Sequence, residues 1–193
     1  MDYKYFLRGI KNIILNPVKA WETIDSETKS LKLPRDSFFF PLIILVSVSA
    51  VIGSLIYINS ELSPVYSLFV GIKCIGVLYL TIYASAYIFG EITYPLDLGK
   101  DFNVSFRIIV FSMTPFLLCE ILSRIFESLL FVNIIGLYGL YIFWTGIEKM
   151  LTPPQYKKMP LLIATAFTIA GIYIVSNLVL TMLLDRVYFA LFA

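Results

Sequence analysis

The stretch FFFPLIILVSVSAVIGSLIYI, residues 38–58, decides the fold class. It contains no charged residue, and at about 1.5 Å per residue a helix of this length reaches roughly 32 Å. The hydrocarbon core of a bilayer is about 30 Å thick, so this segment is long enough to cross it. The run is continuously apolar and lacks the alternation of a membrane-barrel strand, so it predicts a transmembrane helix.

Four more apolar segments along the chain are long enough to cross the bilayer. We expect spans at Val65–Phe89, Asn103–Leu122, Ser128–Ile147 and Pro160–Leu184. The sequence therefore predicts an all-α integral membrane protein with two parts. Residues 1–37 form a charged N-terminal segment, and residues 38–193 form a bundle of five transmembrane helices.

The composition agrees with a membrane environment. Of the 193 residues, 59% are hydrophobic and only 15% are charged, whereas soluble domains are about 45–50% apolar and about 25% charged. The net charge of +2 is too small to indicate nucleic-acid binding. The chain has no histidine and only two cysteines, Cys74 and Cys119, so it predicts neither a zinc site nor a disulfide framework. We expect no cofactor.

The basic residues predict the orientation in the membrane. Eleven lysines and arginines lie in residues 1–37, 90–102 and 148–159, which five spans place on one side of the membrane. Only Arg124 and Arg186 lie on the other side. Because basic residues near span ends are retained in the cytoplasm, we expect a cytoplasmic N-terminus and an external C-terminus. The frequent use of Ile, Lys and Tyr fits a bacterium, and thus the inner membrane.

The N-terminal segment begins with an amphipathic pattern. Within Tyr3–Leu15 the basic residues Lys4, Arg8 and Lys11 share one helical face, and apolar residues occupy the other. Such a helix is expected to lie in the headgroup region with its cations toward anionic lipid. The alternative is that its apolar face packs against the bundle. Trp21 is expected to be a further contact with the membrane surface.

Polar residues inside the predicted spans suggest a cluster. Lys73, Glu120, Asn133 and Asn177 come from four spans and lie in the same half of the bundle. A charge at membrane depth is costly and usually finds a partner or a cavity. The group could line a hydrated cavity of a small transporter or channel. It could equally be a satisfied structural cluster in which Lys73 pairs with Glu120.

Near the other end of the third span, Arg107 is expected to pair with acids of the adjoining loop. The candidate acids are Glu91, Asp97 and Asp101. No residues form a catalytic group, because no histidine is available as a base and no aspartate pair lies in neighbouring spans. The sequence thus predicts a protein that is not an enzyme.

Two motifs and part of the fourth span stand out. The first motif is NPVKAW, residues 16–21, which includes Asn16, Pro17 and Trp21. The second lies in the third span, where Ser105, Phe106 and Arg107 are followed by FSMTP, ending at Pro115. Together with residues 138–146 of the fourth span, these motifs resemble those of the Yip family of Rab-GTPase-interacting membrane proteins, in its compact bacterial-type form.

The resemblance implies a five-span membrane protein without enzymatic activity. Eukaryotic relatives act in vesicle traffic and membrane shaping, through a cytoplasmic N-terminal segment and partner membrane proteins. Here that segment is only 37 residues long and lacks a long docking region, which argues against binding of a Rab-type GTPase. We therefore expect a membrane scaffold whose partners are anionic lipids and other membrane proteins or a second copy of the chain.

Overall fold

The computed structural model describes residues 3–26, 34–57 and 63–192, and every regular element in these ranges is helical. The predicted all-helical fold is therefore confirmed for this part of the chain. The elements are α1 (Tyr3–Leu15), α2 (Pro17–Ser26), the π-helical η1 (Pro34–Phe39), α3 (Phe40–Tyr57), α4 (Ser63–Thr93), the 3₁₀ helix η2 (Tyr94–Leu96), α5 (Phe102–Ile125), the 3₁₀ helix η3 (Glu127–Leu137), α6 (Tyr138–Met150) and α7 (Gln155–Phe192).

Five helical segments are long and apolar enough to cross a membrane, as predicted. They are Pro34–Tyr57, Pro64–Leu96, Phe102–Ile125, Leu129–Met150 and Gln155–Leu191. The last one differs most from the expected range, because α7 starts earlier and continues further. Charged pairs at Lys157–Lys158 and Asp185–Arg186 end the apolar run without ending the helix, since Lys and Arg are good helix formers and Asp is tolerated.

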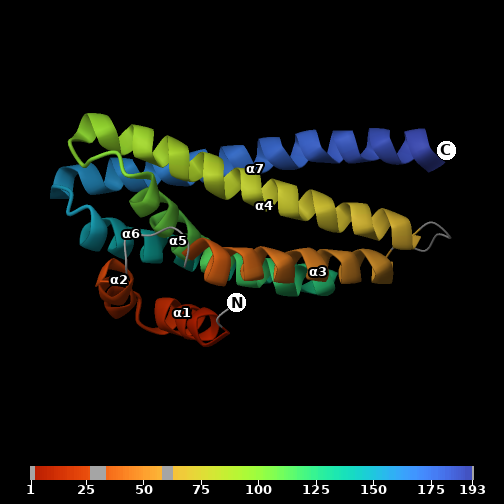
Figure 1. Ribbon diagram of the computed structural model, residues 1–193, viewed down its shortest axis with the longest axis horizontal. Coiled ribbons are helices and arrows are strands. Elements are labelled where there is room, and N and C mark those ends of the chain that lie inside the picture. The colour runs from red at the N-terminus through yellow and green to blue at the C-terminus, as the bar shows by residue number, and fades with distance from the viewer. Residues whose placement is uncertain (1–2, 27–33, 58–62, 193) are drawn as a thin grey trace.

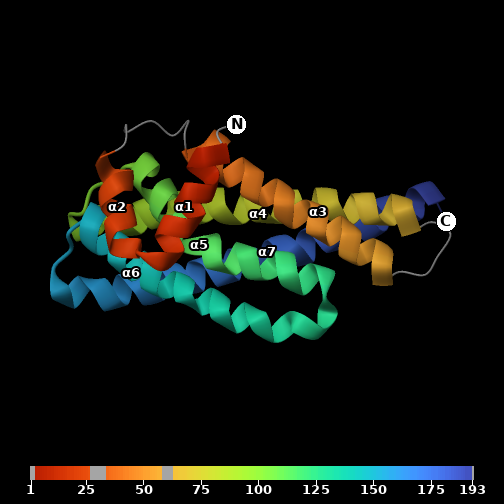
Figure 2. The same ribbon diagram turned by 90° about the horizontal axis from the view of Figure 1, so that it is seen from below.

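Consecutive spanning helices run in opposite directions and pack side by side. α4 lies between α3 and α7, while α5 packs against α3, α4 and the continuous η3–α6 segment. The turns α4–α5 and α6–α7 lie at the same end of the bundle as α2, whereas the C-terminus lies at the opposite end (Figure 1). α1 and α2 cover the side of the bundle formed by α5 and α6 (Figure 2).

An aromatic cluster ties the first span to the third. The Phe38 ring lies 4.4 Å from the ring of Phe111 in a tilted arrangement, and Phe39 meets Phe106 edge-on at 5.5 Å. All four side chains are at most 1% exposed. Aromatic pairs of this kind contribute about 0.5–1.5 kcal/mol beyond their burial, so they fix the start of the first span against the middle of α5.

Two glycines let helix backbones meet directly. A Cβ on Gly53 of α3 would collide with the carbonyl oxygen of Arg124 at the end of α5. A Cβ on Gly139 of α6 would collide with the carbonyl oxygen of Ser112, one turn before Pro115. Close approach through small residues is the usual packing device of membrane helices, and here it brings α3 and α6 onto opposite stretches of α5.

Candidate functional site

Polar side chains gather where α5 ends, and we call them the polar cluster. Its members are Lys73, Glu120, Ser123, Arg124, Asn133, Tyr173 and Thr181, and Asn177 contributes its backbone oxygen. The Glu120 carboxylate binds the Arg124 guanidinium at 2.8 Å. The Ser123 hydroxyl donates to the Glu120 backbone oxygen and to Asn133 Oδ1, both at 3.4 Å. Ser123 thus links the backbone of Glu120 to the Asn133 side chain.

The second half of the polar cluster joins α4 to α7. Lys73 Nζ donates to Thr181 Oγ1 at 3.2 Å, and that hydroxyl donates to the backbone oxygen of Asn177 at 2.7 Å. The predicted Lys73–Glu120 ion pair is therefore wrong. Glu120 finds its cation one turn along its own helix, where the geometry costs no long reach.

Arg124 is the residue that the sequence analysis missed, because it was assigned to the loop after the third span. Its side chain is 27% exposed, and its Nε is buried and has no hydrogen-bond partner among the described residues. Tyr173 and Cys74 lie close enough to interact with it electrostatically. The spacing of Glu120 and Arg124 by four residues was the available indication of this pair.

The depth of the polar cluster follows from a second set of charges near the opposite end of the bundle. There Lys100 binds Glu91, and Lys158 binds Glu148 at 2.7 Å. Lys73 and Glu91 are separated by about 27 Å along α4, a distance close to the roughly 30 Å of the hydrocarbon core. We therefore infer that the polar cluster lies near one boundary of the core and that the first turns of α4 extend beyond it.

Arg107 belongs to the opposite boundary, but its surroundings differ from the prediction. Its side chain is buried, and Nη1 donates to the backbone oxygen of Ile24 on α2 at 3.2 Å. Of the expected acids, Glu91 binds Lys100, and Asp101 caps α5 by accepting from the backbone amide of Asn103 at 2.8 Å. The third, Asp97, forms the left-handed turn after η2, with φ of 60°. Arg107 thus anchors the N-terminal segment instead of the loop.

Trp21 is the main anchor of α2. Its side chain is 0% exposed, and Nε1 donates to the backbone oxygen of Ile142 at 3.0 Å. Its ring meets Phe111 edge-on and fills the space left by Gly146. The expected role of Trp21 at the membrane surface is therefore corrected: the indole is inside the protein, because α6 offers both the space above Gly146 and the carbonyl oxygen of Ile142 as an acceptor.

α1 turns one face to the bundle and another away from it. Phe6 and Ile13 are buried, and the Tyr138 hydroxyl donates to the backbone oxygen of Ile14 at 3.0 Å. Lys4, Arg8 and Lys11 are exposed. The NPVKAW motif makes the link to α2: Asn16 accepts a backbone bond from Ala20 at 2.9 Å, and Pro17 opens the helix, where its missing amide hydrogen costs nothing.

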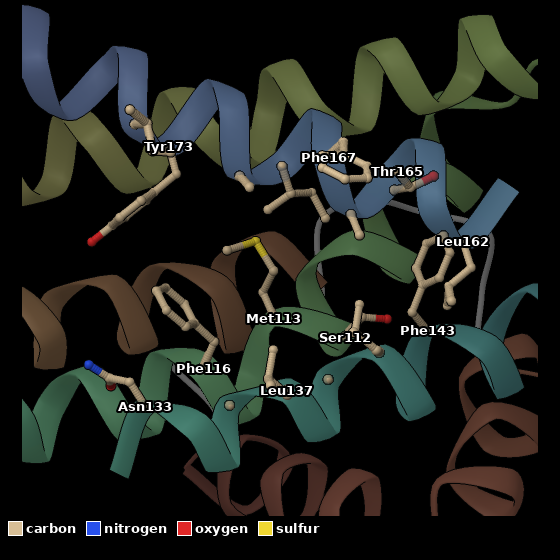
Figure 3. Close-up of a pocket in the computed structure, with 17 residues that line it drawn as sticks. Ser112, Met113, Phe116, Asn133, Leu137, Phe143, Leu162, Thr165, Phe167 and Tyr173 are labelled. Carbon is tan, nitrogen blue, oxygen red and sulfur yellow. The ribbon is translucent and has the colours of Figure 1, made fainter. Parts of the chain in front are cut away.

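A cavity of about 540 Å³ lies between α7 on one side and α5, η3 and α6 on the other (Figure 3). Its walls are mainly apolar, with Leu162 and Phe143 near one end and Asn133 and Tyr173 near the other. Ser112 belongs to its wall, and the buried Ser112 hydroxyl has no partner among the described residues. The cavity thus has an apolar end and an end next to the polar cluster.

The site contains no arrangement typical of metal binding. Within residues 3–26, 34–57 and 63–192, no group of three or more Cys, Asp or Glu side chains could hold a metal ion. Cys74 and Cys119 are buried free thiols on different helices. The chemistry available here is hydrogen bonding and apolar contact, which suits binding and packing.

Comparison with known families gives one match. The family model described as Yip1 domain matches residues 11–184, from α1 into α7. No curated protein and no solved structure matches the chain significantly.

Proposed function

Because the chain belongs to the Yip1 domain family, we propose that it is a non-enzymatic membrane scaffold that organises the bilayer or its proteins. The observation that carries the proposal is the family match over residues 11–184, which includes α2 together with all five spans. The contacts of Trp21 and Arg107 support it, because they hold α2 on the bundle as a fixed part of the fold.

The face of α1 that points away from the bundle is the proposed interaction surface. It carries the exposed cations Lys4, Arg8 and Lys11, along with the exposed apolar side chains Leu7 and Leu15. A basic surface next to a membrane attracts anionic headgroups, at about 1 kcal/mol per cation. We propose that this surface lies on the cytoplasmic face of a bacterial inner membrane and contacts anionic lipid, another membrane protein or a second copy. A Rab-type GTPase is not among the proposed partners.

Transport is not favoured by the arrangement of the polar groups. Glu120 and Arg124 pair within α5, Lys73 binds Thr181 on α7, and the adjoining cavity has mainly apolar walls. A polar solute crossing the bundle would need a continuous polar lining, which these walls do not provide.

Site-specific photo-crosslinking from α1 tests the scaffold proposal. A benzophenone amino acid at Leu7 or Leu15, both more than 60% exposed, should give adducts with lipid headgroups or with another membrane protein in intact membranes. The same probe at Ile13, which is 0% exposed, is the control and should react only within the chain. Purely intramolecular adducts at all three positions would contradict the proposal.

Charge variants separate a lipid partner from a protein partner. The triple variant Lys4→Glu, Arg8→Glu and Lys11→Glu should lose the lipid adducts if anionic headgroups bind this face. The variant with Lys4→Arg and Lys11→Arg keeps all three cations and should behave like the original chain. If lipid adducts persist after the charge reversal, headgroup attraction is not their cause.

A further inference from the structure

We propose that the cavity between α7 and the α5–η3–α6 face holds one acyl chain of a phospholipid, whose phosphate lies at the polar cluster. This inference goes beyond the proposed function, and it does not depend on α1, which lies on the other side of α5 and α6. It concerns the leaflet at the α3–α4 end of the bundle.

The dimensions of the cavity match one hydrocarbon chain. Its wall on α7 runs from Leu162 to Ile174, about 18 Å at 1.5 Å per residue, which is close to half the roughly 30 Å hydrocarbon core. A volume of 540 Å³ over that length gives a mean cross-section of about 30 Å².

The helix packing leaves this space open. α7 packs closely along α4 but makes few contacts with α6. The residues that α7 turns toward the cavity include the small side chains Ala166 and Ala170, opposite Gly136 and Gly139. In lipid an apolar void of this length is filled at little cost by a hydrocarbon chain, because the chain restores the dispersion contacts that the walls lack.

The two cations of the polar cluster have more N–H donors than direct side-chain acceptors, which favours a phosphate at that end. Arg124 offers five N–H groups and Lys73 offers three, while their direct side-chain acceptors are the Glu120 carboxylate and the Thr181 hydroxyl. Arg124 Nε in particular is buried and has no hydrogen-bond partner among the described residues, and such a donor destabilises the fold. A phosphate supplies several acceptor oxygens and negative charge at the boundary of the hydrocarbon core, where lipid phosphates lie.

A photoreactive lipid tests the proposal on the full chain. The purified protein in a maltoside detergent is incubated with phosphatidylglycerol that carries a diazirine in one acyl chain, irradiated, and mapped by peptide mass spectrometry. We expect adducts on the cavity side chains Met113, Phe143 and Ala166. Absence of adducts at all three in the original chain overturns the proposal.

Two variants on α7 distinguish the cavity from the general lipid surface. Ala166→Phe places a ring in the cavity and should abolish the adducts at Met113 and Phe143. Val175→Phe adds a similar ring at a position that is 60% exposed and should leave them unchanged. Equal labelling in both variants shows only annular lipid and overturns the site.

Two further experiments test the chemistry of the occupant, and both remain informative if the Ala166→Phe variant does not fold. The first uses Ser112→Ala, and the second is a competition between lipids. Ser112→Ala removes a hydroxyl from the wall, so labelling by an acyl chain should persist, whereas its loss indicates a polar occupant and overturns the acyl assignment. Excess unlabelled phosphatidylglycerol should compete, and diacylglycerol with the same chains should compete much less. If phosphatidylglycerol and diacylglycerol compete equally well, the polar cluster does not bind the phosphate, and that part of the proposal is wrong.

Discussion

Glu120 and Arg124 form an ion pair that is largely shielded from solvent, with side chains 11% and 27% exposed. Breaking such a pair leaves one charge uncompensated, at about 3–5 kcal/mol, whereas neutralising both groups is milder. Glu120→Gln and Arg124→Gln should therefore each lower the midpoint of thermal unfolding in detergent, and the double variant should lose less than the sum.

The matched comparison is a second set of two single variants and their double variant, made with Lys73→Met and Glu120→Gln. Lys73 binds Thr181 on α7 and not Glu120. The decreases in unfolding midpoint caused by the two substitutions should therefore add in the double variant. The observed pairing would be contradicted by the opposite result. In that case the changes in unfolding midpoint would be additive for Glu120 and Arg124 and non-additive for Lys73 and Glu120.

Gly53 makes a second prediction possible. A methyl group at this position meets the backbone oxygen of Arg124, which cannot move aside like a flexible side chain. Gly53→Ala should thus destabilise the fold by about 1–3 kcal/mol, as overpacking does, and should separate α3 from the end of α5. Gly171→Ala is the control, since no atom lies within 4 Å of the added carbon, and its unfolding midpoint should not fall. Equal midpoints in both variants would refute the close approach.

Among the elements, α1 and α2 were predicted least completely from the sequence, because the surface that covers their apolar faces could not be identified. The periodicity of Lys4, Arg8 and Lys11 predicted a helix with an apolar face in need of cover, but both the bilayer and the bundle can supply that cover. The bundle provides the cover through contacts with Phe38 of η1 and with Tyr138 and Ile142 of α6. These three residues are distant in sequence from the segments that they contact. Only the tertiary structure brings them to this place.

The docking of α2 should depend on Trp21. Trp21→Ala removes a fully buried indole and its hydrogen bond to Ile142, a change that costs about 3–5 kcal/mol in protein cores. Hydrogen–deuterium exchange should then rise in α1 and α2, while the spanning helices stay protected. Val18→Ala, at a position 41% exposed on the same helix, should leave the exchange unchanged. Protection of α2 in Trp21→Ala would argue that other contacts hold it.

Glu22 and Lys149 add a pH-dependent link between α2 and α6. The hydrogen bond from Lys149 at 2.7 Å, and then its charge, hold the pKa of Glu22 below its usual value. A lowered folded-state pKa contributes stability that is present above the unfolded value of about 4.3 and is lost as the pH falls through the folded value. The pair is exposed, so the effect is small.

The difference in unfolding midpoint between the original chain and Glu22→Gln should therefore be present at neutral pH and vanish as the pH falls below the lowered folded-state pKa of Glu22. Asp25→Asn changes another exposed carboxylate of α2 and serves as the control. A difference that grows as the pH falls would have the wrong sign for this mechanism.

For the molecule as a whole, the length of the apolar runs was enough to predict five spans, because the bilayer imposes one thickness on every helix that crosses it. The cavity could not be predicted in this way. Its walls come from Ser112, Asn133, Phe143 and Ala166 on four different elements, and it exists because α7 packs closely on α4 and makes few contacts with α6. The polar cluster was anticipated in part, since charges in apolar runs are visible, but their pairing depends on helix rotation and length.

The orientation of the chain remains a prediction with a direct test. The native Cys74 and Cys119 are buried and are replaced by Ala before single cysteines are introduced at Lys29, Glu61 or Lys157; Lys29 and Glu61 lie outside the described residues. With a cytoplasmic N-terminus, a membrane-impermeant maleimide should label Glu61→Cys in intact cells, and should label Lys29→Cys and Lys157→Cys only after permeabilisation. The replaced chain without added cysteines is the control for background. Labelling of Glu61→Cys only after permeabilisation would reverse the orientation, and the polar cluster and its cavity would then face the cytoplasmic leaflet.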